Sequence, residues 1–258
     1  MSSLSFNGDE TSYLRIQNTS DLNFGTGDFT IEWYQYQTDS NPFPRIFQMG
    51  NYDAGAAIGV SIEVSDEQST FYYWVNGNGN GLFTLESSEY KDQWVHFAIC
   101  RSSGTTQVFM NGISMHSEVF SDDNFNSEDD LVIANESTPI VGSAFGGYLT
   151  YFSWVKGTAR YTSDFTVSNT YPPDTGVLLL KADSFNGTLG GAVGNNNVGT
   201  TPNVPPGFSS TPPAPVVRNW RSLSSLFSNN AVVYYKHGSL ASGGVGSVRN
   251  SSAKARKT

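Results

Sequence analysis

The 258-residue sequence predicts an all-β protein, an antiparallel two-sheet β-sandwich of jelly-roll type that carries an extended C-terminal arm. Two observations predict the sandwich. Apolar and aromatic residues recur at every second position in many short runs, and turn-forming residues separate these runs at intervals of about ten residues. No stretch of a dozen residues has the 3.6-residue period of an amphipathic helix. A third observation, the uneven distribution of charge along the chain, predicts the arm.

Each period-two run predicts one strand with one face in the core, because successive side chains of a strand point to opposite faces. The runs are Phe29-Ile31-Trp33, Ile46 and Phe47, Ile58-Val60-Ile62-Val64, Phe71-Tyr73-Val75, and Val95-Phe97-Ile99. The turns that we expect between them are residues 25–27, 42–44, 76–81, 102–104, 111–112 and 146–147. Asn111-Gly112 predicts a tight hairpin, because Asn-Gly accepts the positive φ angles of such turns.

Residues 94–100 predict an interior strand, because both of its faces are mostly apolar. Trp94, His96, Ala98 and Cys100 share one face, opposite Val95, Phe97 and Ile99. We therefore expect His96 to be a packed, hydrogen-bonded side chain and Cys100 to be an inert buried thiol. Only two other histidines exist, His116 and His237, so we expect neither a multi-histidine metal site nor a cofactor.

The sequence WVHFAICRSSGTTQVFMNG, residues 94–112, resembles the central hairpin of the laminin-G-like and concanavalin-A-like lectin/glucanase superfamily. Residues 4–8 with Tyr13-Leu14 resemble the first strands of that family, and residues 29–33 resemble its third. Residues 145–154, followed by Ala159-Arg160-Tyr161, resemble its late strand and the segment after it. The resemblance covers about residues 3–183 and implies a concanavalin A-like sandwich. It does not select an activity, because this fold hosts lectins, hydrolases and structural modules.

The carboxylates do not match the glucanase branch of the superfamily, which the resemblance associates with an E-x-D-x-x-E strand. A retaining glycosidase needs two carboxylates about 5 Å apart on one face. Glu63 and Asp66 are three residues apart and would face opposite sides of a strand, and Glu86 and Glu89 fail in the same way. Glu63 and Glu67 share a face only if no turn intervenes, and we expect a turn. We therefore predict no catalytic residue and no enzymatic activity.

Two kinds of binding site stay open on the predicted sandwich. Residues 122–130 concentrate carboxylate and amide oxygens in one loop, which we expect to be a solvated loop, with a calcium site as the alternative. A lectin site would need exposed aromatic side chains beside amides and carboxylates. The candidates are Tyr52-Asp53, Trp74 to Asn80, and Tyr90.

The charge of the chain divides near Pro215. Residues 1–215 hold 23 acidic and 7 basic residues, a net charge of −16, whereas residues 216–258 hold no acidic and 7 basic residues. We therefore expect a globular body at residues 1–183, a Gly/Asn- and Pro-rich linker at 184–215 and a basic extended arm at 216–258. The predicted partner-binding residues of the arm are Trp220, Leu223, Leu226, Phe227, Tyr234, Tyr235, Arg249, Lys254, Arg256 and Lys257.

Residues 234–258, YYKHGSLASGGVGSVRNSSAKARKT, resemble short basic tails on virion proteins of large icosahedral DNA viruses of algae. This resemblance implies a structural role, and we predict a non-enzymatic minor capsid or capsid-associated protein whose arm docks on acidic neighbouring subunits. Location in the virion after synthesis in the host cytoplasm follows, since we expect neither a signal peptide nor a membrane span. Seven cations over 43 residues argue against a nucleic-acid partner. The alternative is a carbohydrate-binding lectin module that attaches to host glycans, and the remote alternative is a glycoside hydrolase.

Overall fold

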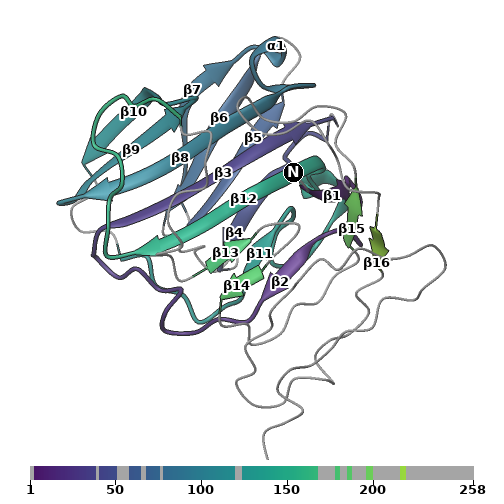
Figure 1. Cartoon of the computed structure of the whole chain (residues 1–258), viewed down its shortest axis with the longest axis horizontal. Coiled ribbons are helices and arrows are strands. Elements are labelled where there is room, and N and C mark those ends of the chain that lie inside the picture. Colours follow the sequence, from purple (N-terminus) through teal and green to yellow (C-terminus); the bar gives the residue numbers. More distant parts are fainter. Residues whose placement is uncertain are drawn as a thin grey trace, which may run out of the picture.

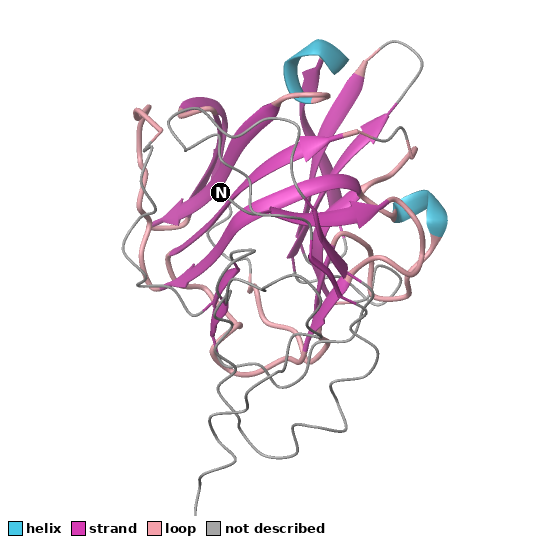
Figure 2. Cartoon of the chain, turned by 45° about the vertical axis from the view of Figure 1, so that its right-hand side comes forward, coloured by secondary structure: helices cyan, strands magenta, loops and turns pink. Residues whose placement is uncertain are grey.

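The computed structural model describes residues 3–38, 41–50, 58–64, 68–75, 78–119 and 124–167. It also describes the backbone of four short strands further along the chain, β13 (Leu178–Leu180), β14 (Phe185–Gly187), β15 (Asn196–Gly199) and β16 (Val216–Arg218). These residues form two antiparallel sheets packed face to face, so the predicted all-β sandwich is confirmed (Figure 2).

The larger sheet has ten strands among the described residues, and Figure 1 looks onto it. Its main path is β10 (Ile113–Val119), β9 (Thr105–Met110), β8 (Trp94–Ser102), β3 (Phe29–Gln37), β12 (Gly146–Lys156), β1 (Ser3–Asn7), β15 and β16. Beside this path, β13 pairs with β12 and with β14. The central trio of β8, β3 and β12 contains the longest strands, and β8 forms the predicted hairpin with β9.

The smaller sheet has six strands among the described residues and lies behind the larger one in Figure 1. Its order is β2 (Leu14–Ile16), β11 (Leu131–Ile133), β4 (Arg45–Met49), β5 (Ile58–Val64), β6 (Ser69–Val75) and β7 (Asn78–Leu85). All of its pairings are antiparallel.

The core lies between the two sheets and is rich in aromatic rings. Trp33 of β3 is fully buried, with its ring centroid 5.6 Å from that of Phe97 and 5.7 Å from that of Phe47 in the opposite sheet. Phe47 in turn meets Trp154 at 5.7 Å. Burying side chains of this size removes large apolar areas from water, which is the main stabilising contribution to folding. The period-two runs of the sequence therefore mark the core-facing strands as predicted.

Two of the predicted turns need correction. Asn111 and Gly112 have φ angles of 50° and 83°, so the Asn-Gly hairpin is confirmed. In contrast, Asn78 to Gly81 are not a turn but the first half of β7, paired in register with β6. Gly146 and Gly147 likewise begin β12 and pair with β1. In both places backbone pairing to a neighbouring strand outweighs the low strand preference of glycine.

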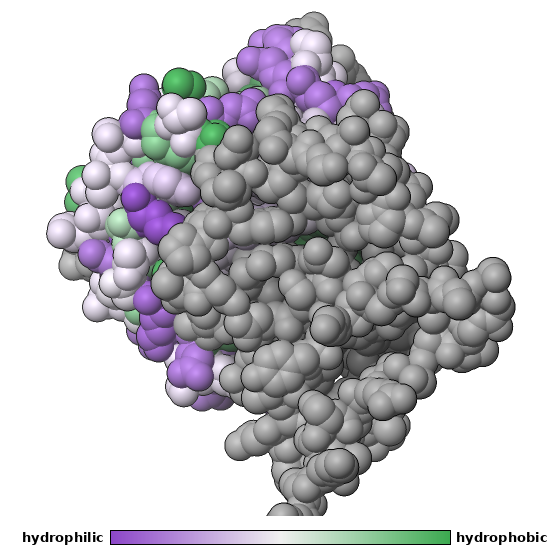
Figure 3. Space-filling view, in the orientation of Figure 1, coloured by the Kyte–Doolittle hydropathy of each residue, from purple (hydrophilic) through white to green (hydrophobic). Residues whose placement is uncertain are grey.

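Helical structure is limited to single turns in the described part of the chain. These are α1 (Ser87–Tyr90) and the 3-10 turn η1 (Val141–Ser143). Among the described residues, no helix has the length and apolarity that crossing a bilayer requires. On the face shown in Figure 3, hydrophilic and near-neutral residues are intermixed over the described surface, with only small separate apolar spots. The apolar residues of the strands therefore lie mainly inside the sandwich.

The segment that follows β12, residues 157–167, runs over the outer face of the larger sheet; we call it the strap. Ala159, Tyr161 and Phe165 pack against the outward side chains of β8 and β9. The Phe165 amide donates a hydrogen bond of 2.8 Å to the carbonyl oxygen of Gly112. The strap thus covers the second apolar face of the interior strand that the sequence predicted.

Candidate functional site

A charged cluster lies beneath the strap, around Glu32 of β3. Glu32 is 1% exposed, and its carboxylate accepts hydrogen bonds from the Arg160 guanidinium and, at 3.0 Å, from the Tyr161 hydroxyl. His96 Nε2 lies 3.3 Å from Glu32 Oε2. Burial alone would raise the pKa of Glu32, but the hydrogen bond from His96 and the charges of His96 and Arg160 outweigh it and hold that pKa below its ordinary value.

This cluster has the geometry of a structural anchor. Its members are buried and bonded to one another, and Thr30 Oγ1 accepts a hydrogen bond from the Arg160 amide at 2.9 Å and donates one to the Thr158 carbonyl oxygen at 2.9 Å. The expectation that His96 is a packed, hydrogen-bonded side chain is confirmed. Cys100 is also buried, and burial raises the pKa of its thiol to about 11, which fits the predicted inert thiol.

The carboxylates that we compared with the catalytic pair of a glucanase make other contacts in the structure. Glu63 Oε1 lies 3.4 Å from the Arg45 guanidinium on the outer face of β4 and β5. Asp66 and Glu67 lie outside the described residues. Our strand-parity argument for Glu86 and Glu89 was wrong, because these two residues form a reciprocal capping box at the start of α1.

The lectin candidates on the smaller sheet are largely occupied. Trp74 lies on the outer face of β6 but is only 8% exposed, with the Arg45 guanidinium 4.7 Å from its ring centroid. A Cβ atom on Gly79 would lie 2.5 Å from the indole, so the ring lies against the β7 backbone. Tyr90 is fully buried, with its hydroxyl 2.6 Å from Ser69 Oγ, and is excluded as an exposed aromatic. Tyr52 and Asp53 lie outside the described residues.

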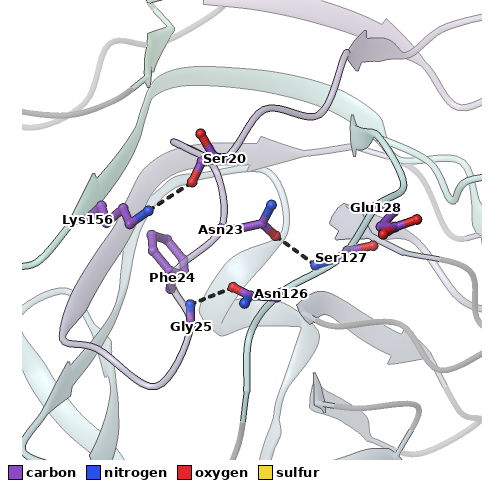
Figure 4. A pocket seen from close by; sticks show the side chains of 8 residues that line it. All are labelled: Ser20, Asn23, Phe24, Gly25, Asn126, Ser127, Glu128 and Lys156. Carbon is purple, nitrogen blue, oxygen red and sulfur yellow. Dashed lines mark hydrogen bonds between the residues drawn. The ribbon is translucent and has the colours of Figure 1, made fainter.

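A cavity of about 540 Å³ opens at the edge of the sandwich near β2, where two loops meet the end of β12 (Figure 4). One loop is residues 17–28, between β2 and β3, and the other is residues 124–130, before β11. We call this hollow the loop cavity. Its lining residues are Ser20, Asn23, Phe24, Gly25, Asn126, Ser127, Glu128 and Lys156.

Hydrogen bonds between the two loops give the loop cavity its shape. Asn126 Oδ1 accepts the Gly25 amide at 2.8 Å, and Asn23 Oδ1 accepts the Ser127 amide at 2.7 Å. The Asn23 amide group also donates to Asn18 Oδ1 at 3.2 Å. The two asparagines are therefore fixed in orientation by backbone groups of the opposite loop, as Figure 4 shows.

The floor of the loop cavity is tied to the core. Phe24 stacks on Phe29 and Trp154, with ring centroids 4.3 Å and 4.6 Å apart. The buried Arg101 side chain donates to the carbonyl oxygens of Thr26 and, at 3.0 Å, Gly27. A preformed wall of this kind costs little ordering entropy when a ligand binds.

Three charged or amide groups of the loop cavity remain open to a ligand. Glu128 is exposed, and its carboxylate has no partner among the residues that the structure describes. The Asn126 amide nitrogen is exposed beside it. Lys156 Nζ donates to the Ser20 carbonyl oxygen at 2.8 Å and retains two further donors. Figure 4 shows Glu128 and Lys156 at opposite ends of the hollow.

In the loop that we considered for calcium, the described part uses one of its carboxylates within the protein. Residues 121–123 lie outside the described part of the chain. In residues 124–130, Asp130 accepts the Asn18 amide at 3.0 Å and lies 3.7 Å from the Arg15 guanidinium. Within the described residues, no three side chains of His, Cys, Asp or Glu group closely enough to hold a metal ion.

Sequence reasoning found part of the loop cavity. Asn126, Ser127 and Glu128 belong to the loop that was singled out for its oxygens, but Phe24 and Lys156 carried no signal, since only folding brings them near it. The predicted partner-binding residues of the arm lie outside the described residues, as do the greater parts of the linker and the arm. Strands β14 and β15 fall within residues 184–215, and β16 within residues 216–258.

The family of the domain follows from comparison with known proteins. Residues 7–159 match the family model of the concanavalin A-like lectin/glucanases superfamily, which is more than half of the chain. The chain belongs to this superfamily. The match includes β2 to β12 and both loops of the loop cavity, so the resemblance of residues 94–112 to this superfamily is confirmed. A comparison with curated proteins found no match.

Several solved structures share the fold of this chain at low sequence identity. One is a putative carbohydrate binding protein from Bacteroides ovatus, with a TM-score of 0.54 at 13% identity over 78% of this chain and 60% of that chain. Another is the full extracellular region of zebrafish Gpr126/Adgrg6, with a TM-score of 0.54 at 14% identity over 70% of this chain and 24% of that chain. The chain thus spans less than two thirds of either structure, and neither points to a virion protein.

Proposed function

We propose that this protein is a non-enzymatic carbohydrate-binding protein and that the loop cavity is its glycan site. The observation that carries the proposal is the arrangement in Figure 4, where an asparagine, a glutamate and a lysine surround a hollow with an aromatic edge at its floor. These groups come from loops at the end of a rigid sandwich, where binding sites on such scaffolds commonly form.

The chemistry of the loop cavity suits a sugar. A pyranose ring presents hydroxyl groups that both donate and accept hydrogen bonds, and it presents apolar C–H faces. The Glu128 carboxylate offers acceptors, and the Asn126 amide and Lys156 offer donors. Phe24, which is 4% exposed, adds a small apolar area at the floor. A volume of about 540 Å³ lies within the range of small-molecule sites.

Membership of the lectin/glucanase superfamily supports binding better than catalysis. Among the described carboxylates, Glu32 is enclosed under the strap and Glu63 pairs with Arg45. Glu86 and Glu89 cap α1, and the carboxylate of Glu128 stands alone in the loop cavity without a second carboxylate among the lining residues. Glycoside hydrolysis by a retaining or an inverting route needs two. The shared fold of the Bacteroides ovatus protein is compatible with this proposal.

The test is a glycan array probed with the full-length protein, followed by calorimetry on the best-binding glycan. Glu128→Gln and Lys156→Met should each weaken binding about 10-fold or more, because each removes a charge-assisted hydrogen bond. Glu10→Gln, an exposed glutamate in the β1–β2 connection, is the matched control and should bind as the unmodified protein does. Absence of binding across the array would overturn the function, and binding unaffected by both variants would overturn the site.

A role in virion assembly is the second candidate, and the charge division of the chain is the observation that favours it. Its proposed partners are capsid subunits with acidic surfaces. Removing the charges of Arg249, Lys254, Arg256 and Lys257 should mainly lower the association rate at low salt. Trp220→Ala and Phe227→Ala should instead raise the dissociation rate. Incorporation into purified particles that persists after deletion of residues 216–258 would contradict docking through the arm, and absence of the protein from purified particles would contradict the role in the virion.

A further inference from the structure

The two loops that form the loop cavity are acidic. Residues 17–28 and 124–130 together contain five acidic residues and no Lys or Arg. They are Asp21, Asp28, Glu128, Asp129 and Asp130. Of these, Asp130 lies near Arg15, and Asp28 accepts the Ser103 amide at 2.8 Å. The lining itself holds one acidic residue, Glu128, and one basic residue, Lys156, so the excess negative charge near the loop cavity comes from the rest of its two loops.

The loop cavity retains one unused acceptor group and two groups with unused donors. Asn23 is used on both of its polar atoms, and the oxygen of Asn126 is used by the Gly25 amide. What remains is the Glu128 carboxylate, two donors of the Asn126 amide nitrogen and two donors of Lys156. A carboxylate can accept hydrogen bonds from two adjacent hydroxyl groups, one at each of its oxygens.

Charged ligands fit this arrangement poorly. A sulfate or carboxylate group entering the loop cavity would approach Glu128 and the acidic loops around it, and like charges at short range disfavour binding. An ammonium group would satisfy Glu128 but would share the hollow with Lys156. A neutral sugar can donate to Glu128 at one end and accept from Lys156 at the other.

We propose that the loop cavity selects a neutral pyranose with two adjacent hydroxyl groups and discriminates against sulfated or uronic glycans. This inference rests on the proposed glycan-binding function and names the class of glycan. Glu128 is its specificity-determining residue, because it holds the diol and supplies the repulsion toward anions. Lys156 orients the same ring from the opposite end.

The experiment compares matched glycans on the full-length protein, each neutral glycan beside the same glycan carrying one sulfate, at low and at high salt. The neutral form should bind at least about 10-fold more tightly than the sulfated form at low salt. This ratio of affinities should decrease at high salt, because screening weakens the repulsion. Glu128→Gln should lower the affinity for the neutral glycan about 10-fold or more and decrease the ratio of affinities between the neutral and the sulfated form. Glu128→Lys should invert the preference, and Glu10→Gln should leave it unchanged.

The outcomes separate this inference from the function on which it rests. Equal or tighter binding of the sulfated form by the unmodified protein would overturn the neutral-sugar inference while leaving glycan binding intact. Tighter binding of an amino sugar than of its neutral parent would also overturn it. Binding of no glycan in any form would overturn the proposed function itself. Circular dichroism of each variant establishes that it is folded.

Discussion

At the scale of single residues, the buried carboxylate of Glu32 is the most costly group to disturb. It is held by Arg160, Tyr161 and His96 in a site closed to water. Removing one member of such a buried set leaves the other charged groups buried without a partner. The resulting loss in the free energy of unfolding usually exceeds what the whole set contributes. The same enclosure raises the pKa of Tyr161, because burial and the neighbouring Glu32 charge both disfavour its ionised form.

We predict that Glu32→Gln lowers the free energy of unfolding by about 3–5 kcal/mol at pH 7. The pKa of Glu32 lies below its ordinary value of 4.5 in the folded protein, so the unfolded chain binds its proton first. The stabilisation is therefore present above pH 4.5 and is lost as the pH falls through the folded pKa. Urea unfolding from pH 7 to pH 3 should show the difference from the unmodified protein shrinking below pH 4.5. A difference that stays constant with pH would contradict this account, and Glu10→Gln serves as the control.

A second prediction at this scale concerns Cys100. With its pKa raised to about 11, about one thiol in a thousand is ionised at pH 8, and the side chain is buried between β3 and the strap. Alkylation by iodoacetamide should be very slow in the folded protein and fast in urea, where the ordinary pKa of about 8.5 returns. Mass spectrometry of quenched samples measures this, and rapid labelling of the folded protein would contradict the burial of this thiol.

At the scale of elements, the strap and β7 show how neighbouring segments decide local structure. The strap has no strand or helix of its own and is held by side chains, with Tyr161 and Phe165 stacked at a centroid distance of 3.5 Å. In β7, glycines face the rings of β6. A Cβ atom on Gly81 would meet Thr70 Cγ2 at 3.1 Å and the Tyr72 ring at an ordinary contact distance, whereas a Cβ atom on Gly79 would lie 2.5 Å from the Trp74 ring and displace it. Glycine there is a packing requirement.

We predict that Phe165→Ala loosens the strap and lowers the free energy of unfolding by about 2 kcal/mol, because it deletes the stack with Tyr161 and a contact with Phe109. Phe43→Ala is a matched control with the same loss of atoms, since Phe43 is 47% exposed, and it should cost less than about 0.5 kcal/mol. Denaturant titration compares the two. Faster hydrogen exchange in β8 and β9 of Phe165→Ala would locate the loosening, and equal stability of both variants would exclude an anchoring role for the strap.

At the scale of the whole molecule, the aromatic core between the sheets indicates that the sandwich folds as one unit. We predict that residues 1–183 alone give a β-type far-UV circular dichroism spectrum and a single cooperative unfolding transition. The fragment loses β15, which pairs with β1 at the edge of the larger sheet, and this edge loss should reduce stability without abolishing folding. A dominant helical spectrum, or a gradual transition without cooperativity, would contradict this prediction.

The sequence by itself determined the class of fold, the strands of the core and the central hairpin, because alternation of apolar residues and the Asn-Gly turn are local signals. It also determined the packed state of His96 and Cys100, since both lie among apolar neighbours on one strand face. It misread residues 78–81 as a turn, because the reason for Gly79 lies across the sheet in the ring of Trp74. Only the tertiary structure could assemble the loop cavity, since Phe24, Glu128 and Lys156 are more than 25 residues apart along the chain and only the pairing of distant strands brings them together.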